Sequence, residues 1–299
     1  MAESQGIGRD RQGGCAVESH CRNAEAIAAG RFSSQIVDIA GLEGRRYVVK
    51  RHGAAGSVIL KLPTTRHPDL VANEFTGFQL CGALGLNCAS VKVISRVDAE
   101  LPEQVPFENT LAVERFDRGP DGLRIHMEEF AQVLRYDTKH KYGKGLHVDY
   151  ANMLRIVDQL STRPAQDVQE FVNRFVAFIL MGNTDAHLKN WALRYPDGVH
   201  PELAPLYDPV CVTAFFEDVP LTDYGINRAI DTAVRAFSWD DLATMLKQAR
   251  VLRASRVLQV AKSVAAQAKA DWPELLKGAP PSMQRAMTER LTGGVALAR

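Results

Sequence analysis

The chain has 299 residues, of which 46% are hydrophobic and 24% are charged, a composition typical of folded globular proteins rather than disordered ones. Its 36 basic and 35 acidic residues nearly cancel, which argues against the strong positive field of general nucleic-acid binding. No uncharged apolar run approaches the roughly 20 residues of a membrane span, and residues 1–11 are polar where a signal peptide would be apolar. We therefore expect a soluble cytoplasmic protein with no membrane partner and no direct nucleic-acid partner.

The amino-terminal part contains an irregular segment followed by short apolar runs. Residues 1–30 mix Gly, Arg, Ser and Glu without a sustained period, which predicts a flexible arm. From residue 35 onward, β-branched runs separated by glycine-containing breaks indicate antiparallel strands joined by turns. These runs are Ile36–Ile39, Tyr47–Val49 and Val58–Leu62.

A helix and two more strands complete the predicted β-rich lobe, residues 31–118. Asp69 occupies an N-cap position, the apolar residues from Leu70 to Leu84 repeat with helical spacing, and Gly85 marks the helix end. The two further strands are expected at residues 91–94 and 110–116.

The remaining residues, 119–299, are predicted to form a mainly helical lobe. Helical spacing extends over 127–134, 150–160 and 167–181, and a late helical series begins at Trp239. Strands followed by helices predict an α+β fold with two lobes and a cleft between them.

Two details belong to the late helical series. Ser238 and Asp241 have the spacing of a capping box, with Asp in place of the usual Glu. Residues 261–270 are rich in Ala, Gln and Lys, which predicts an exposed helix.

The five cysteines are odd in number and contain neither a CxxC pair nor a Cys/His zinc pattern. The sequence therefore does not predict a disulfide framework or a structural zinc site.

Polar residues cluster after the apolar helix that ends near Met181. Asp185 and Asn190 could simply cap or turn the chain there. A second carboxylate, Asp208, follows a turn and a short apolar strand, Leu203–Leu206. An Asp, an Asn five residues later and a second Asp after a hairpin is an arrangement used in phosphoryl transfer, where the first Asp orients the acceptor hydroxyl and the other two residues hold Mg²⁺.

Two side chains between these residues have two interpretations each. His187 is a candidate catalytic residue, although a lone histidine is more often hydrogen-bonded within the structure. Lys189 could neutralise a transferring phosphoryl group, or it could be an exposed lysine.

A candidate nucleotide-binding pair lies in the β-rich lobe. Lys61 closes an apolar strand, where a lysine is costly unless it meets an anion. Glu74 on the following helix could pair with it, as in the lobe of a kinase that fixes the phosphate-binding lysine. Lys61 could instead lie on an edge strand with its amine in water.

Two glycine-containing turns compete for the role of a phosphate-covering loop. One spans residues 40–45 and contains Gly41, Gly44 and Arg45; the other spans residues 52–57. Neither matches the GxGxxG or Walker pattern, and either could be only a hairpin turn.

Together these segments resemble the serine/threonine kinases of the HipA type, the toxin halves of bacterial toxin–antitoxin pairs. The resemblance extends from about residue 36 to about residue 213. The matching segments are Ile59–Pro63, Asn73–Glu74, Leu111–Arg118, Met127–Gln132, Lys141–Gly143, Asn183–Asn190 and Leu203–Asp208.

The resemblance implies a two-lobed protein-kinase-like fold that binds ATP and Mg²⁺. Asp185 would be the catalytic aspartate, and Asn190 and Asp208 would be the magnesium ligands. Lys61 would contact the ATP phosphates. The adenine would contact the backbone at Glu114 and Phe116.

The sequence departs from the family pattern in the glycine loop, whose autophosphorylated serine ejects the loop and inactivates the enzyme. Asp38 aligns with that serine and Arg45 with a loop lysine, while Ser33 and Ser34 lie nearby. Little precedes this loop, so the chain is similar to the short HipT variant, which lacks the amino-terminal subdomain.

The resemblance therefore implies a kinase toxin that phosphorylates a serine or threonine of a protein, with an aminoacyl-tRNA synthetase as the suggested target. It also implies a HipB-like DNA-binding antitoxin and a small HipS-like partner. Two alternatives stay open. One is a small-molecule kinase, and the other is a kinase-like binding or corepressor module with little activity.

Overall fold

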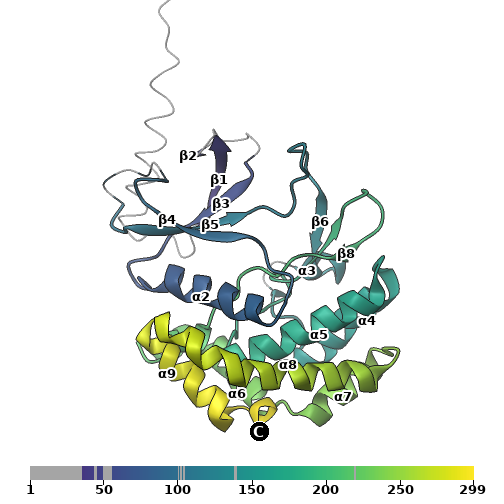
Figure 1. Ribbon diagram of the computed structural model, residues 1–299. Coiled ribbons are helices and arrows are strands. Elements are labelled where there is room, and N and C mark those ends of the chain that lie inside the picture. The colour runs from purple at the N-terminus through teal and green to yellow at the C-terminus, as the bar shows by residue number, and fades with distance from the viewer. Residues whose placement is uncertain are drawn as a thin grey trace, which may run out of the picture.

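The computed structural model describes residues 36–43, 46–49, 56–99, 101, 103, 105–137, 140–218 and 220–299. Strands occupy one end of this part of the chain and helices the other (Figure 1). No helix within these ranges is both long and apolar enough to cross a bilayer. This arrangement confirms the predicted α+β class.

A five-stranded antiparallel sheet has the order β2-β1-β3-β5-β4. Its strands are β1 (Ile36–Glu43), β2 (Arg46–Val49), β3 (Val58–Lys61), β4 (Val91–Ser95) and β5 (Asn109–Glu114). Helix α2 (Leu70–Ala83) lies between this sheet and the helical part (Figure 1). The predicted strands and the predicted helix are confirmed.

The alternation of side chains along β3 directs Lys61 towards α2. Val58 and Leu60 are buried in a small core on one face of the sheet, together with Ile94 and Ala112. Successive side chains of a strand point to opposite faces, so Lys61 lies on the same face as Ile59, which packs against the main core.

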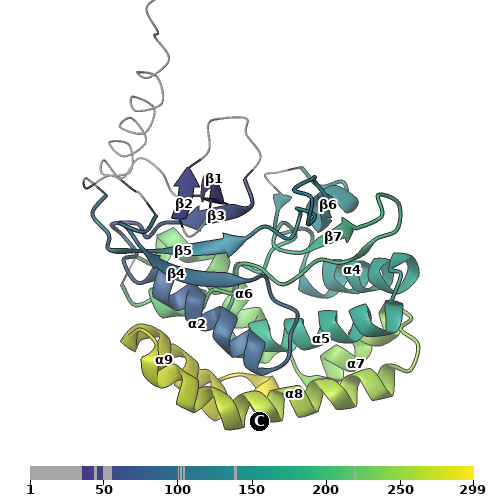
Figure 2. The same ribbon diagram turned by 45° about the horizontal axis from the view of Figure 1, so that its top comes forward.

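The helical part is built around α5 (Pro164–Met181), which is buried along most of its carboxyl-terminal half. A three-stranded sheet of order β6-β7-β8 lies apart from the larger sheet in both views, above α4 and α5 (Figures 1 and 2). Its strands are β6 (His126–Glu129), β7 (Ala192–Tyr195) and β8 (Glu202–Leu203). The other α-helices are α3 (Phe130–Val133), α4 (Leu146–Leu160), α6 (Gly225–Ala236), α7 (Trp239–Gln248), α8 (Ala254–Leu275) and α9 (Pro281–Glu289).

Short helical turns also lie in the carboxyl-terminal part of the chain. They are η2 (Val212–Phe215), η3 (Leu221–Tyr224), η4 (Leu276–Gly278), η5 (Arg290–Gly294) and η6 (Ala296–Ala298). The predicted capping box is confirmed, because the Asp241 amide donates to Ser238 Oγ at 3.2 Å and the Ser238 amide donates to Asp241 Oδ2 at 2.8 Å.

One sequence prediction in the helical part was wrong, and a second was confirmed only in part. The predicted helix at 127–134 is strand β6 followed by the single turn α3, because β6 pairs with β7 far along the chain. The segment 261–270 is helical but only partly exposed. Its residues Ala261 and Ala268 are fully buried in the main core. The proposed boundaries at residues 30 and 118 stay predictions.

Candidate functional site

Three charged side chains from distant parts of the chain meet where the five-stranded sheet approaches the helical part. Lys61 Nζ at the end of β3 lies 2.5 Å from Glu74 Oε1 on α2 and also pairs with the carboxylate of Asp208, which follows β8. Their side chains are 19%, 4% and 33% exposed, respectively. The pairing of Lys61 with Glu74 excludes the edge-strand interpretation in which the amine points only into water.

Burial and charge act in opposite directions on this cluster. Burial lowers the pKa of Lys61, but the neighbouring charges of Asp208 and Glu74 outweigh it, so the net pKa lies above its ordinary value. Burial raises the pKa of Glu74, although the Lys61 charge opposes the rise. An ammonium group that stays protonated at neutral pH is a suitable partner for an anion entering the site.

Helix α2 also packs against, and hydrogen-bonds to, the segment that carries Asp208. Asn73 accepts a hydrogen bond from the Cys211 amide at 2.8 Å and donates to the Cys211 carbonyl at 3.1 Å. Gly77 faces Pro209 so closely that a β-carbon there would lie 1.7 Å from the Pro209 carbonyl oxygen. The position of Glu74 is therefore tied to that of Asp208 by backbone contact as well as by charge.

Asp185 lies in a loop that begins where α5 ends. Gly182 has a left-handed conformation, with φ of 78°, and ends the helix. The buried side chain of Asn183 then joins two loops: its Oδ1 accepts from the Asp185 amide at 3.2 Å, and its Nδ2 donates to the Asp208 carbonyl at 3.0 Å. Asn190 Nδ2 donates to the Asp185 carbonyl at 2.8 Å.

The Asp185 carboxylate is half-exposed and has three polar neighbours. Tyr142 donates a hydrogen bond to Oδ1 at 2.6 Å, Lys141 Nζ lies 3.7 Å from that oxygen, and His187 Nε2 lies 3.9 Å from it. Burial, followed by the hydrogen bond to Asp185, raises the pKa of Tyr142, so the phenol stays protonated as a donor.

His187 is a buried neighbour of Asp185. Its side chain is 7% exposed, and its ring meets that of Tyr142 edge to face at 5.5 Å. Burial lowers the pKa of His187, although the charge of Asp185 opposes this. The imidazole is therefore mainly neutral at neutral pH.

Lys189 lies on the same loop, close to two residues that sequence reasoning did not select. Its carbonyl accepts a hydrogen bond from Tyr207 at 2.9 Å. The pKa of Glu129 is raised, mainly by burial. The charge of Lys189 opposes this rise, and the charge of Asp208 adds to it. Glu129 thus adds a carboxyl group to the electrostatic surroundings of Asp208.

The remaining predicted nucleotide contacts lie in the five-stranded sheet and the segment after it. Glu114 ends β5, and its amide donates to the Ser90 carbonyl at 2.8 Å. The Phe116 ring lies 5.5 Å from that of Tyr207. Gly41 lies in β1 opposite Val48, whereas Gly44, Arg45, Ser33 and Ser34 lie outside the described residues.

Asn190 and Asp208 provide the kind of ligands that Mg²⁺ prefers. An amide oxygen and a carboxylate are hard oxygen donors, and Mg²⁺ usually keeps waters and phosphate oxygens as its other ligands. Asp208 has a left-handed backbone, with φ of 55°, and its carbonyl is held by Asn183 and by the Val210 amide. This conformation is uncommon for a non-glycine residue, and Asp adopts it more readily than most.

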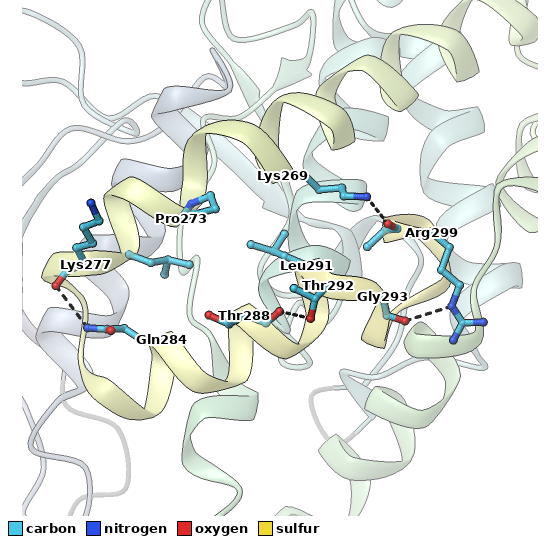
Figure 3. A pocket seen from close by; sticks show the side chains of 11 residues that line it. Lys269, Pro273, Lys277, Gln284, Thr288, Leu291, Thr292, Gly293 and Arg299 are labelled. Carbon is cyan, nitrogen blue, oxygen red and sulfur yellow. Dashed lines mark hydrogen bonds between the residues drawn. The ribbon is translucent and has the colours of Figure 1, made fainter.

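A cavity of about 740 Å³ lies elsewhere, between α8, α9 and the last turns (Figure 3). Its polar lining groups largely bond to the protein itself. Lys269 Nζ donates to the Ala298 carbonyl at 2.6 Å, and Arg299 Nε donates to the Gly293 carbonyl at 3.1 Å. The cavity shares no lining residue with the Lys61 cluster, so we place the candidate active site at that cluster and the Asp185 loop.

Sequence reasoning found the charged members of the site but missed the residues that position them. Asn183 and Tyr142 lie within the matched segments, and their closeness in sequence to Asp185 and Lys141 was the available signal. Gly77 gave no such signal, because its contact with Pro209 exists only in the folded chain.

The fold is of the two-lobed, protein-kinase-like class. Among solved structures, HipA from Shewanella oneidensis, in a complex with HipB and operator DNA, matches with a TM-score of 0.63 and 22% identity, over 85% of this chain and 62% of that one. The proinflammatory kinase CtkA of Helicobacter pylori matches with a TM-score of 0.53 and 14% identity, over 89% and 95% of the two chains.

The sequence comparisons define the family. Residues 34–272 match the HipA-like C-terminal domain, so the chain belongs to this family, and the match extends beyond residue 213, where the sequence resemblance ended. A putative kinase of Sinorhizobium fredii, Y4dM, is 30% identical over 94% of this chain and 72% of its own length. A second, Y4mE, is 32% identical over 64% of this chain and 44% of its own length.

Proposed function

We propose that the chain is an ATP- and Mg²⁺-dependent serine/threonine protein kinase. The observation that carries this proposal is the junction of Lys61, Glu74 and Asp208, beside a loop that presents a half-exposed Asp185. A lysine fixed by a glutamate on the next helix, an Asp–Asn pair five residues apart and a second Asp are the parts that protein kinases use to position ATP and the acceptor hydroxyl.

Each residue has a distinct part in the proposed reaction. Lys61, held by Glu74, contacts phosphate oxygens. Asp208 and Asn190 hold Mg²⁺, which when bound neutralises charge on the transferring phosphates. Asp185 accepts the hydrogen bond of the acceptor hydroxyl and takes its proton as the phosphoryl group transfers. Tyr142 and the Asn183 bridge hold Asp185 in position.

The resemblance to HipA supports a more specific proposal. We infer that the kinase is the toxin of a toxin–antitoxin pair, with an aminoacyl-tRNA synthetase as its substrate and a HipB-like antitoxin as its partner. The Shewanella protein was solved in a complex with HipB and operator DNA, which supports the choice of antitoxin.

The direct test is transfer of labelled γ-phosphate from ATP in a cell extract. We expect label on a host protein with the native chain and with the control variant Asp271→Asn, which changes an exposed aspartate on α8. Asp185→Asn should abolish the label. Mass spectrometry of the labelled protein then identifies the substrate.

Other outcomes would contradict parts of the proposal. Label on a nucleotide or another small molecule would favour a small-molecule kinase. A folded chain that binds an antitoxin but transfers no phosphate would favour a corepressor module.

A further inference from the structure

Helix α6 contributes a side chain to the candidate active site that sequence reasoning did not select. Asn227 lies in the first turn of α6, and its Oδ1 is 3.3 Å from the Tyr142 hydroxyl. The same hydroxyl donates to Asp185 Oδ1 at 2.6 Å. Asn227 lies outside the segments that carry the sequence resemblance. One phenol group therefore connects α6 to the Asp185 carboxylate.

The phenol of Tyr142 has one proton for two acceptors. Its bond to Asp185 is short, whereas its contact with Asn227 is long for a hydrogen bond. The two contacts together form a three-centre hydrogen bond in which Asp185 is the main acceptor. Asn227 therefore restrains the phenol without removing it from Asp185.

The polar neighbours of the Asp185 carboxylate gather at one of its two oxygens. Tyr142 donates to Oδ1, and Lys141 Nζ and His187 Nε2 lie 3.7 Å and 3.9 Å from the same atom. Within the part of the chain that the structure describes, no group donates a hydrogen bond to Oδ2. The side chain is 38% exposed. A carboxylate that is held through Oδ1 leaves Oδ2 for an incoming hydroxyl.

Helix α6 is fixed to the end of α5 by a buried arginine. Arg290 is fully buried, its Nη1 donates to Asp231 Oδ1 at 2.5 Å, and its Nη2 donates to the Ile179 carbonyl at 2.7 Å. Asp231 lies one turn beyond Asn227 on α6, and Ile179 lies in the last turn of α5. One buried side chain thus holds both the helix of Asn227 and the helix that leads into the Asp185 loop.

The backbone next to Tyr142 is bonded to the Asp185 loop as well. The Leu188 amide donates to the Lys141 carbonyl at 3.0 Å. This bond fixes the chain but does not act on the phenol oxygen. Among the described residues, the polar partners of that oxygen are Asp185 and Asn227 alone.

We propose that Asn227 is a positioning residue of the kinase, which acts through Tyr142 to present Asp185 Oδ2 to the acceptor hydroxyl. This inference rests on the proposed function. The acceptor hydroxyl gives its proton to Oδ2 while its oxygen bonds to the γ-phosphorus, and the bond between that phosphorus and the ADP oxygen breaks. Tyr142 keeps its own proton and its bond to Oδ1 throughout.

The test measures the rate at which the full chain labels protein in a dialysed cell extract supplied with γ-labelled ATP. The rate of Asp185→Asn is subtracted as background. We expect Asn227→Ala to lower the maximal rate about 10–100-fold, because a small misplacement of a reacting group is costly. The ATP concentration at half-maximal rate should stay unchanged, because Asn227 has no contact with the Lys61 cluster.

Two further variants separate positioning from a general loss of structure. Asn227→Gln keeps an amide and should recover part of the rate. Thr232→Ala is the control on the same helix, since that exposed hydroxyl bonds only to the Arg228 carbonyl in the described part of the chain, and its rate should be normal.

The double variant tests whether Asn227 acts through the phenol. Tyr142→Phe should lower the rate by itself, and adding Asn227→Ala to it should change the rate by less than about twofold. A native rate in Asn227→Ala, or an Asn227→Ala loss that is equally large in the Tyr142→Phe background, would overturn the proposal. If the native chain labels no protein, the proposed function fails and this inference fails with it. If the native chain is active and only these variants behave otherwise, this inference alone fails.

Discussion

The cluster of Lys61, Glu74 and Asp208 joins three segments of the chain through charged side chains, whereas Asp185 is held mainly through its backbone. In the cluster each charge has an opposite charge as its partner. In the Asp185 loop, the amide and carbonyl are fixed by Asn183 and Asn190, and the carboxylate stays 38% exposed.

This difference indicates that the Lys61 cluster and the Asp185 loop have separate tasks. A cluster of paired charges around the buried Glu74 keeps a fixed geometry, which suits the binding of phosphate groups. An accessible carboxylate on a rigid backbone can meet an incoming hydroxyl. Variants of Lys61, Glu74 and Asp208 should therefore act on folding and nucleotide binding. Variants of Asp185 should act on turnover.

The largest expected effect is that of Asp185→Asn on turnover. The change removes the proton acceptor but keeps the shape, so we expect phosphate transfer to fall by about 10²–10⁴-fold. The free energy of unfolding should change by less than about 0.5 kcal/mol, because the side chain is half-exposed. Transfer assays and urea unfolding measure both. A variant that transfers phosphate normally, or that is strongly destabilised, would contradict the division of tasks.

Gly77→Ala tests the fastening of α2 to the segment after Asp208. The added β-carbon would lie 1.7 Å from the Pro209 carbonyl oxygen, and overpacking of this kind costs about 1–3 kcal/mol. Urea unfolding should show this loss. Gly82→Ala is the matched control on the same helix, since nothing lies within 4 Å of its β-carbon, and it should stabilise the chain by about 0.5–1 kcal/mol. Equal effects of the two variants would count against the close contact.

Asn183→Ala tests the bridge between the two loops. The variant leaves the Asp185 amide and the Asp208 carbonyl each without one partner, which costs about 1–3 kcal/mol for buried groups. We also expect slower phosphate transfer, because both loops lose a common support. Asn173→Ala is the control, since that side chain accepts a hydrogen bond from Gln169 on the same helix. Its transfer rate should stay normal.

The smallest expected effect is the pH dependence that His187 contributes. Burial holds the pKa of this histidine below its ordinary value of 6.5 in the folded chain, so the unfolded chain binds a proton at a higher pH. The stability that His187 contributes is therefore present above pH 6.5 and is lost as the pH falls through the folded-state pKa. Urea unfolding at several pH values should show a smaller acid loss in His187→Gln. An unchanged pH profile would contradict the burial argument.

Much of the site could be predicted from the sequence because its chemistry is carried by short local motifs. The spacing of Asp185, Asn190 and Asp208 and the position of Lys61 on a strand before Glu74 are visible without a structure. The structure brings Lys61, Glu74 and Asp208 into contact and joins the Asp185 loop to Asp208 through Asn183.

What could not be predicted depends on contacts between distant residues. The apolar residues of the segment 127–134 have helical spacing, but residues 127–129 form a strand because they pair with β7, more than sixty residues away. Gly77 is an unremarkable helical glycine until Pro209 packs against it. The helix predicted at 261–270 is present, but its buried face was not predicted, because Ala261 and Ala268 pack into a main core built from distant parts of the chain.

The most direct test of the central claim is calorimetric titration of the chain with ATP and Mg²⁺. The account predicts binding that weakens at least about tenfold in Lys61→Met and that stays unchanged in Lys92→Met, a variant of an exposed lysine on β4. Equal binding by the two variants, or no binding by the folded native chain, would contradict the assignment of Lys61, Glu74 and Asp208 as the nucleotide site.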